Sequence, residues 1–260
     1  MFRIDWGRLG EAFPGDRQQI TEEATHVLTA TDAADGATAL VQLLGHKGDL
    51  RVIAFRRSFD ELGRFELALS RTKLFRYLES TTSYVSIVEL GMYEMTAKIH
   101  RTLAEQGLTH GTDAYNAGFD QEMTRQQQRV SGRLFPAIPA TRQVCFYPMN
   151  KRRGETLNWY SEPFERRAEM MLEHGKVGRE YAGKVTQVIS GSIGFDDWEW
   201  GVDLFADDPL VFKKLIYEMR FDEASAKFAE FGPFYVGLQF PVAELGAFLE
   251  GRLPAPPTTK

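Results

Sequence analysis

The sequence contains very little cysteine and no long apolar run. Cys145 is the only cysteine among 260 residues, so the chain can form neither an intrachain disulfide nor a zinc site built from several cysteines. No apolar stretch approaches the roughly 20 residues that a membrane-spanning helix needs. The first 16 residues lack the basic and apolar regions of a secretion signal. We therefore expect no membrane insertion and a reducing, cytoplasmic location.

A net positive charge is also missing. The formal net charge is -5, which argues against a nucleic-acid partner bound through its phosphates. Positive charge is nevertheless concentrated between residues 130 and 184, where six Glu accompany ten basic residues: Arg133, Arg142, Lys151, Arg152, Arg153, Arg166, Arg167, Lys176, Arg179 and Lys184. This segment is either a solvated face or a pocket for a small polyanion.

Several common catalytic motifs are absent. The stretch Gly191-Ser-Ile-Gly194 lacks the third glycine and the lysine of a phosphate-binding loop, and it predicts a bend between two strands. No Gly-x-Ser-x-Gly elbow exists, and Cys145 lies in a predicted strand, where a thiol is usually inert. Histidines spaced three or four residues apart would favour a metal site of the two-His type. None of the five has such a partner: His26, His46, His100, His110 and His174.

The hydrophobic periodicity predicts alternating strands and helices in the first half of the chain. Alternation and β-branched residues favour strands at residues 25–30, 51–56 and 81–93. Amphipathic stretches favour helices at residues 35–45 and 59–78. Residues 94–130 have a polar, helical pattern that is typical of a connecting segment.

The second half has a clearer pattern. It predicts strands at residues 143–149, 184–193, 198–205 and 234–240, with helices at residues 162–180 and 208–219. The order β-α-β-β-α-β is that of a ferredoxin-like unit. We therefore predict an α+β fold of two ferredoxin-like units. The boundaries are residues 1–130 for the first unit with its connecting segment, 131–252 for the second unit, and 253–260 for a Pro-rich, disordered tail.

One histidine stands out by its context. Met170 and Met171 precede His174 by about one helical turn, so they would share a buried helix face with it. A lone histidine in such a place is either a core or capping residue or a haem ligand. Haem iron needs only one protein ligand, and the opposite face of the ring then stays free for peroxide.

A second group of candidates lies in the segment YPMNK. Tyr147 and Lys151 could both face one cavity at the end of a strand. Tyr147 is either a packing residue or a phenol that loses an electron and a proton, and Lys151 could orient a carboxylate. Three tryptophans nearby could form walls for a flat macrocycle or an ordinary core: Trp159, Trp198 and Trp200.

Three segments together resemble a known family: FYPMNKRRGETLNWY, EHGKVGREYAGKVTQVISGSIGFDDWEWGVDLFADDP and YEMRFDEASAKFAEFGPFYVG. They are similar to the chlorite dismutase-like haem superfamily and, within it, to the coproheme decarboxylases. The resemblance is strong over residues 133–240 and weak before them. It implies a dimeric α+β barrel of two ferredoxin-like units, haem binding by the second unit, and a homopentamer.

The resemblance also implies an activity and its residues. Coproheme (iron coproporphyrin III) would be both substrate and redox centre, and hydrogen peroxide would drive the oxidative decarboxylation of two propionates to the vinyls of haem b. His174 would be the axial iron ligand, Tyr147 the radical-forming tyrosine, and Lys151 the lysine beside the reactive propionate. The remaining implied contacts with the macrocycle are Arg133, Met149, Trp159, Gln187, Trp198, Trp200, Arg220 and Ser225.

Two alternative functions remain. A non-catalytic haem or porphyrin carrier would also use His174. A chlorite dismutase or peroxidase is the weakest alternative, because Gln187 stands where chlorite dismutases carry a cationic arginine that stabilises oxyanions. Coproporphyrin ferrochelatase, which would supply the substrate, is a possible partner under the first interpretation.

Overall fold

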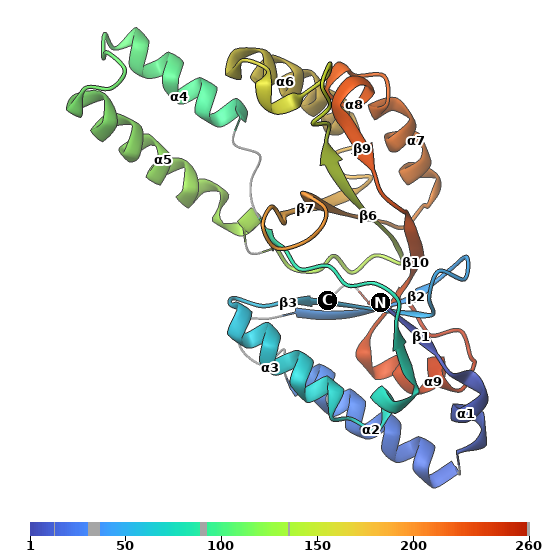
Figure 1. The fold of residues 1–260 in the computed structure, drawn as a ribbon. Coiled ribbons are helices and arrows are strands. Elements are labelled where there is room, and N and C mark those ends of the chain that lie inside the picture. Colours follow the sequence, from blue (N-terminus) through green and yellow to red (C-terminus); the bar gives the residue numbers. More distant parts are fainter. Residues whose placement is uncertain (13, 31–36, 89–92, 135, 259–260) are drawn as a thin grey trace.

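The computed structural model describes residues 1–12, 14–30, 37–88, 93–134 and 136–258, without the side chains of 14, 30, 93–95 and 126–134 (Figure 1). The strands are β1 (Phe2–Ile4), β2 (Ala37–Leu43), β3 (Leu50–Phe55), β4 (Leu78–Ser80), β5 (Ile87–Val88), β6 (Gln143–Lys151), β7 (Thr186–Gly191), β8 (Trp200–Ala206), β9 (Ala229–Phe231) and β10 (Tyr235–Phe240). The α-helices are α1 (Trp6–Glu11), α2 (Pro14–Ala30), α3 (Phe59–Ser70), α4 (Tyr93–Glu105), α5 (Asp113–Leu134), α6 (Phe164–Glu180), α7 (Leu210–Met219), α8 (Glu223–Phe228) and α9 (Leu245–Leu249). The short 3-10 helices are η1 (Leu74–Tyr77), η2 (Trp159–Ser161) and η3 (Val242–Glu244).

Among the described residues, one antiparallel sheet of ten strands runs through both halves of the chain. Its order is β4-β1-β3-β2-β10-β6-β8-β7-β5, and β9 pairs with the far end of β6. Strand β10 joins the halves, because it pairs with β2 on one side and with β6 on the other. At Gly237 a Cβ atom would lie 2.3 Å from the Gln42 carbonyl oxygen, so the approach of β10 to β2 requires glycine.

The inner faces of the two halves pack against each other. Their shared core contains Val41 and Ile53 from the first half with Val188 and Phe205 from the second. A buried ion pair crosses the same space. Arg51 Nη2 on β3 donates to Asp203 Oδ2 on β8 at 2.9 Å, and Arg51 Nη1 donates to Oδ1. The two halves therefore form one barrel-like body rather than two independent units.

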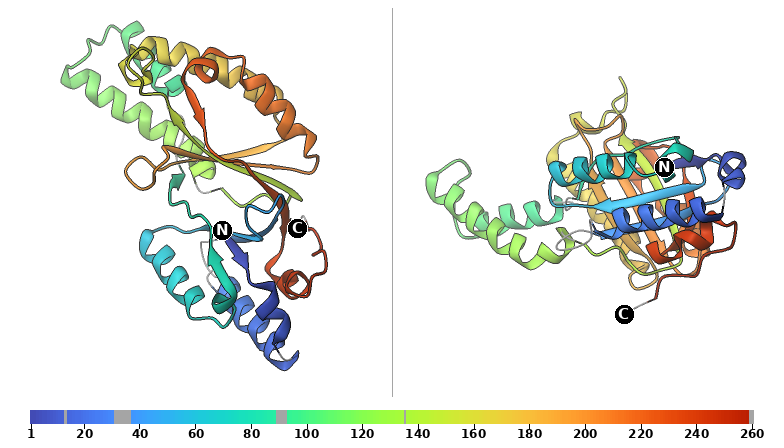
Figure 2. Two further views of the ribbon diagram at one scale, coloured as in Figure 1. Left: turned by 45° about the vertical axis from the view of Figure 1, so that its right-hand side comes forward. Right: turned by 90° about the horizontal axis from the view of Figure 1, so that it is seen from below.

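Helices cover the outer faces of the sheet (Figures 1 and 2). Helices α2, α3 and α9 lie over the strands of the first half, while α6, α7 and α8 lie over β6, β7 and β8. The α4–α5 hairpin extends sideways and contacts α6. No helix within the described ranges combines the length and apolarity needed to cross a membrane. The predicted α+β fold of two ferredoxin-like units is confirmed.

Two predictions for the first half are wrong. Residues 25–30 belong to α2 rather than to a strand, because Ile20, Ala24 and Leu28 continue a buried helical face at four-residue spacing. Residues 37–43 form β2 rather than a helix, because pairing with β3 and β10 overrides the helix propensity of their alanines. The helix predicted at 59–78 ends at Ser70, and the strand predicted at 81–93 is reduced to β5 within the described residues.

The second half agrees better with the sequence, with one correction. The strand predicted at residues 143–149 does not end there, because β6 continues through Pro148 to Lys151. The pairing of β6 with β10 ends at Phe146, and its pairing with β9 begins at Met149. Pro148 lies between these positions, so its missing N–H removes no hydrogen bond from either ladder. The Pro-rich tail keeps a contact with the body: Pro254 is buried, and Ala255 N–H donates to Glu244 Oε2 at 3.0 Å.

Candidate functional site

Strand β6 carries two of the predicted functional side chains on one face. Alternation along the strand turns Tyr147 and Lys151 toward the helices and turns Val144 and Phe146 toward the inner core. Val177 of α6 packs against the same apolar cluster as Tyr147. The strand and helix α6 therefore enclose a common layer.

The Tyr147 phenol is surrounded by aromatic rings. Its ring stacks on Phe234 with centroids 4.7 Å apart, and Phe231 lies 5.7 Å away. Burial raises the pKa of Tyr147 above its ordinary value, and the nearby charge of Arg220 acts in the opposite direction. No described residue forms a hydrogen bond with its hydroxyl. The phenol is therefore protonated at neutral pH and leaves its oxygen available to another group.

Lys151 is a buried cation with few partners. Its Nζ donates to the Ala224 carbonyl at 3.3 Å and lies 4.4 Å from the centre of the Trp159 ring. Burial lowers the pKa of Lys151 to about 8, although Asp222 and Glu199 both act to raise it. Such an ammonium gains stability from an additional anionic partner.

His174 on α6 is oriented by a carboxylate. Its Nδ1 lies 3.0 Å from Asp222 Oδ2 and 3.3 Å from Ser225 Oγ. The His174 side chain is 27% exposed, whereas that of Asp222 is 5% exposed. Burial by itself would raise the pKa of Asp222, but hydrogen bonds from His174 and Ser225 hold this pKa below its ordinary value. With Nδ1 held by the carboxylate, Nε2 is left as the nitrogen that can bind iron.

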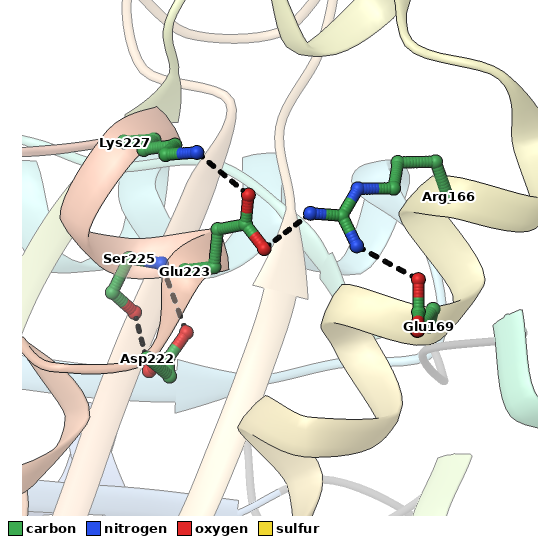
Figure 3. Close-up of polar contacts among 6 residues, drawn as sticks. All are labelled: Arg166, Glu169, Asp222, Glu223, Ser225 and Lys227. Carbon is green, nitrogen blue, oxygen red and sulfur yellow. Dashed lines mark hydrogen bonds and ion pairs between the residues drawn. The ribbon is translucent and has the colours of Figure 1, made fainter.

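Asp222 also begins helix α8. It is the N-cap, and its Oδ1 accepts from the Ser225 N–H at 2.9 Å. Figure 3 shows the next residue, Glu223, turned the other way, between Lys227 and Arg166. Arg166 belongs to α6, so α8 is held beside the helix that carries His174.

Gln187 faces the same layer from β7. A Cβ atom at Gly178, one turn after His174 on α6, would lie 3.9 Å from Gln187 Nε2 and 3.4 Å from Met219 Cε. Both distances are ordinary van der Waals contacts, so the glycine lets α6 and Gln187 lie close together. The side chains present fit a porphyrin by their chemistry, because they offer an imidazole to the iron and a buried ammonium to a carboxylate of the macrocycle.

The other predicted contacts lie around these residues in different ways. Trp159 is almost fully buried beneath Lys151, and Trp200 pairs with Met149 in the sheet. Trp198 lies against the backbone at Gly232. The guanidinium of Arg220 is 5.3 Å from the ring of Phe231, next to Tyr147. Arg133 belongs to α5, but its side chain lies outside the described residues.

The basic segment does not gather at one pocket. Arg152 pairs with Glu230 at 3.5 Å and Arg153 with Glu199 at 3.6 Å. Lys176 pairs with Glu173 along the exposed face of α6. Much of the local positive charge is thus neutralised by acidic side chains, including Glu199 just before β8 and Glu230 of β9.

Two histidines far from His174 come together unexpectedly. His100 and His110 have ring centres 6.0 Å apart and line a cavity of about 610 Å³ with Tyr115 between α4, α5 and α6. Within the described part of the chain, however, no three His, Cys, Asp or Glu side chains are grouped closely enough to hold a metal ion. Iron at His174 would therefore rely on a porphyrin for its other ligands, as haem iron does.

Sequence reasoning missed Asp222 as the partner of His174. The segment DEAS does indicate a helix start, with Asp as N-cap. Its contact with an imidazole 48 residues away follows from the packing of α8 on α6, which no local pattern records.

The profile of the chlorite dismutase family matches residues 17–240 of this chain. The chain belongs to the chlorite dismutase family. The coproheme decarboxylase of Staphylococcus saprophyticus is 43% identical over 241 residues, which cover 91% of this chain and 88% of that protein.

Other relatives point to haem. A putative heme-binding protein of Natronomonas pharaonis is 44% identical over 94% of this chain, but the chain spans only 39% of that protein's length. The solved structure of a heme-binding protein from Thermus thermophilus superposes with a TM-score of 0.80 at 40% identity. It covers 96% of this chain and 92% of its own.

Proposed function

We propose that this chlorite dismutase family member decarboxylates coproheme to haem b with hydrogen peroxide. The observation that carries the proposal has two parts. An oxidisable phenol (Tyr147) and a buried ammonium (Lys151) lie on one face of β6, and the start of α8 contacts both that ammonium and a carboxylate-bound imidazole (His174). The relative from Staphylococcus saprophyticus that bears the name coproheme decarboxylase supports it.

In this proposal each residue has a defined task. His174 binds the iron through Nε2, and Asp222 keeps the proton on Nδ1. Iron bound there would supply the oxidising equivalents of the reaction, taken from peroxide. Tyr147 gives up an electron and its proton and then takes a hydrogen atom from the β-carbon of a propionate. For each vinyl, the propionate loses carbon dioxide, one proton and two electrons. One peroxide takes up the two electrons with that proton and a second one from solvent, and becomes two waters.

The surrounding residues hold the substrate. Lys151 binds the carboxylate of the reacting propionate, which returns part of the free energy lost by burying the ammonium. By the resemblance, Arg133, Met149, Arg220 and Ser225 would contact the propionates, and Trp159, Trp198 and Trp200 would support the macrocycle. Gln187 is neutral, so it gives no charge stabilisation to a chlorite-derived oxyanion, and chlorite turnover should be negligible.

The test is product analysis after adding peroxide to the protein–coproheme complex. The wild type should yield a porphyrin lighter by two molecules of carbon dioxide and four hydrogen atoms. Tyr147→Phe should bind coproheme but stop before decarboxylation, while Tyr217→Phe, a change at an exposed tyrosine, should react normally. A fully active Tyr147→Phe variant would refute the radical role. Binding without any vinyl product in the wild type would identify a carrier instead.

Three further parts of the proposal concern the cellular setting. A homopentamer is proposed from the resemblance to the coproheme decarboxylases, and coproporphyrin ferrochelatase is the proposed supplier of substrate. The free, buried thiol of Cys145 supports a cytoplasmic location, where thiols stay reduced.

A further inference from the structure

The first turn of α8 has contacts with both His174 and Lys151. Asp222 holds the imidazole, and the Ala224 carbonyl accepts from the Lys151 ammonium. Helix α8 has only six residues, which is too short to be stable by itself. Its position therefore depends on the contacts that it makes with neighbouring elements.

Apolar packing fixes one side of α8. Ala224 and Phe228, one turn apart, pack against Trp159 and against Met170 of α6. Apolar burial has little directional preference, so this contact permits small rotations of α8 about its axis. Directional polar contacts must select one orientation.

Those polar contacts come from an ion-pair network between α6 and α8 (Figure 3). Arg166 Nη2 donates to Glu223 Oε2, and Arg166 Nη1 donates to Glu169 Oε2 at 2.7 Å. Lys227 Nζ donates to the other Glu223 oxygen at 2.8 Å. Arg166 precedes His174 by two helical turns on α6, so the network ties α8 to the helix that carries the imidazole.

Small rotations of α8 matter because His174 Nδ1 has two acceptors within reach. Asp222 Oδ2 lies at 3.0 Å and Ser225 Oγ at 3.3 Å, and a single Nδ1 proton bonds mainly to one of them. A carboxylate acceptor makes the opposite nitrogen a stronger donor to a metal than a hydroxyl does. The orientation of α8 therefore sets how strongly Nε2 donates to a metal.

We propose that Arg166 and Glu223 are positioning residues, which hold α8 so that Asp222 rather than Ser225 accepts the His174 proton. The inference rests on the proposed binding of iron at His174. The side chains of Arg166 and Glu223 are 41% and 34% exposed, and ion pairs at such positions contribute little to overall stability. Removing the network should therefore change the axial bond without unfolding the protein.

The first experiment measures the iron–histidine stretching band of the ferrous coproheme complex by resonance Raman spectroscopy. Arg166→Ala and Glu223→Gln should each move the band to lower frequency, toward the position in Asp222→Asn. The double variant should match the single ones, because the two residues act as one unit. Glu173→Gln, which removes the exposed pair with Lys176, should leave the band in place. An unmoved band in both Arg166→Ala and Glu223→Gln would overturn the proposal.

A second experiment tests the choice between the two acceptors. In a Ser225→Ala background the competing hydroxyl is gone, so Glu223→Gln should move the band less than it does alone. If Glu223→Gln moves the band equally far with and without Ser225, competition between Asp222 and Ser225 for the His174 proton is overturned as the explanation.

Two controls separate this inference from the proposed function. A band that persists in His174→Ala would show that another residue binds the iron, which contradicts the proposed function. The positioning role has its own readout in the protein without porphyrin, where the NMR signal of the His174 Nδ1 proton should move in Glu223→Gln and stay in Glu173→Gln. An unchanged signal in Glu223→Gln would refute the positioning role.

Discussion

Replacing Lys151 by methionine should stabilise the protein at neutral pH and weaken its binding of coproheme. The ammonium is 8% exposed, and burial lowers its pKa from 10.5 to about 8. At about 1.4 kcal/mol for each pH unit between these values, holding Lys151 charged in the folded protein costs about 3 kcal/mol. Methionine removes this cost.

The variant also loses two favourable contacts of the ammonium. The hydrogen bond to the Ala224 carbonyl contributes about 1 kcal/mol, and the contact with the Trp159 ring contributes about as much, although a methionine sulfur recovers part of the latter. We therefore expect a net gain of about 1–2 kcal/mol in the free energy of unfolding at pH 7. Losing a charge-assisted hydrogen bond to the substrate should weaken coproheme binding about 10- to 100-fold.

The pH dependence provides the sharper test. Between pH 8 and pH 10.5 the folded wild type binds fewer protons at Lys151 than the unfolded chain does, so its stability from this group rises with pH. The variant lacks that rise. Urea unfolding at pH 7 and pH 10 should therefore show the advantage of Lys151→Met shrinking or reversing, while Lys176→Met, at an exposed lysine, changes in parallel with the wild type. A constant difference between Lys151→Met and the wild type would refute the reasoning.

Two further predictions concern the join between the two halves. Asp203→Asn leaves the buried Arg51 without its counter-charge and should lower the free energy of unfolding by about 3–5 kcal/mol in urea titrations; a loss below about 1 kcal/mol would contradict this. Gly237→Ala forces β10 away from the Gln42 carbonyl and should cost about 1–3 kcal/mol or more, whereas Gly63→Ala, with open space around it in α3, should be neutral or slightly stabilising. Equal thermal midpoints for the two glycine variants would disprove the steric argument.

The success of sequence reasoning differs between the two halves for a physical reason. In the second half, local signals agree with the tertiary structure: Pro163 precedes α6, and Asp208 accepts from the Leu210 N–H at the start of α7. In the first half they conflict, since residues 37–43, for which the local pattern predicts a helix, form a strand by pairing with β3 and with β10, which lies almost 200 residues later. A local sequence pattern cannot reveal a pairing partner so far along the chain.

The candidate site shows the same limit. His174, Tyr147 and Lys151 can be selected from the chain because their side chains have distinctive chemistry. Their partners are harder to find, because the sequence around a carboxylate such as Asp222 indicates only that it caps a helix. No sequence pattern indicates that the backbone carbonyl of Ala224 accepts a hydrogen bond from Lys151.

The two halves of the chain contribute differently to the site, and this difference explains where the recognisable motifs lie. The partners described for Tyr147, Lys151 and His174 come from β6 and the chain after it, on the outer face of the sheet. The first half contacts β8 from the inner face of the sheet, where Arg51 binds Asp203. The neighbours of Asp203 on β8, Val202 and Leu204, face outward into the layer that contains Tyr147. The first half must therefore keep this pairing and the β2–β10 ladder, and the family match includes it from residue 17 onward. Residues 133–240 must also keep the geometry of the site itself, which is why the motifs of the site lie there.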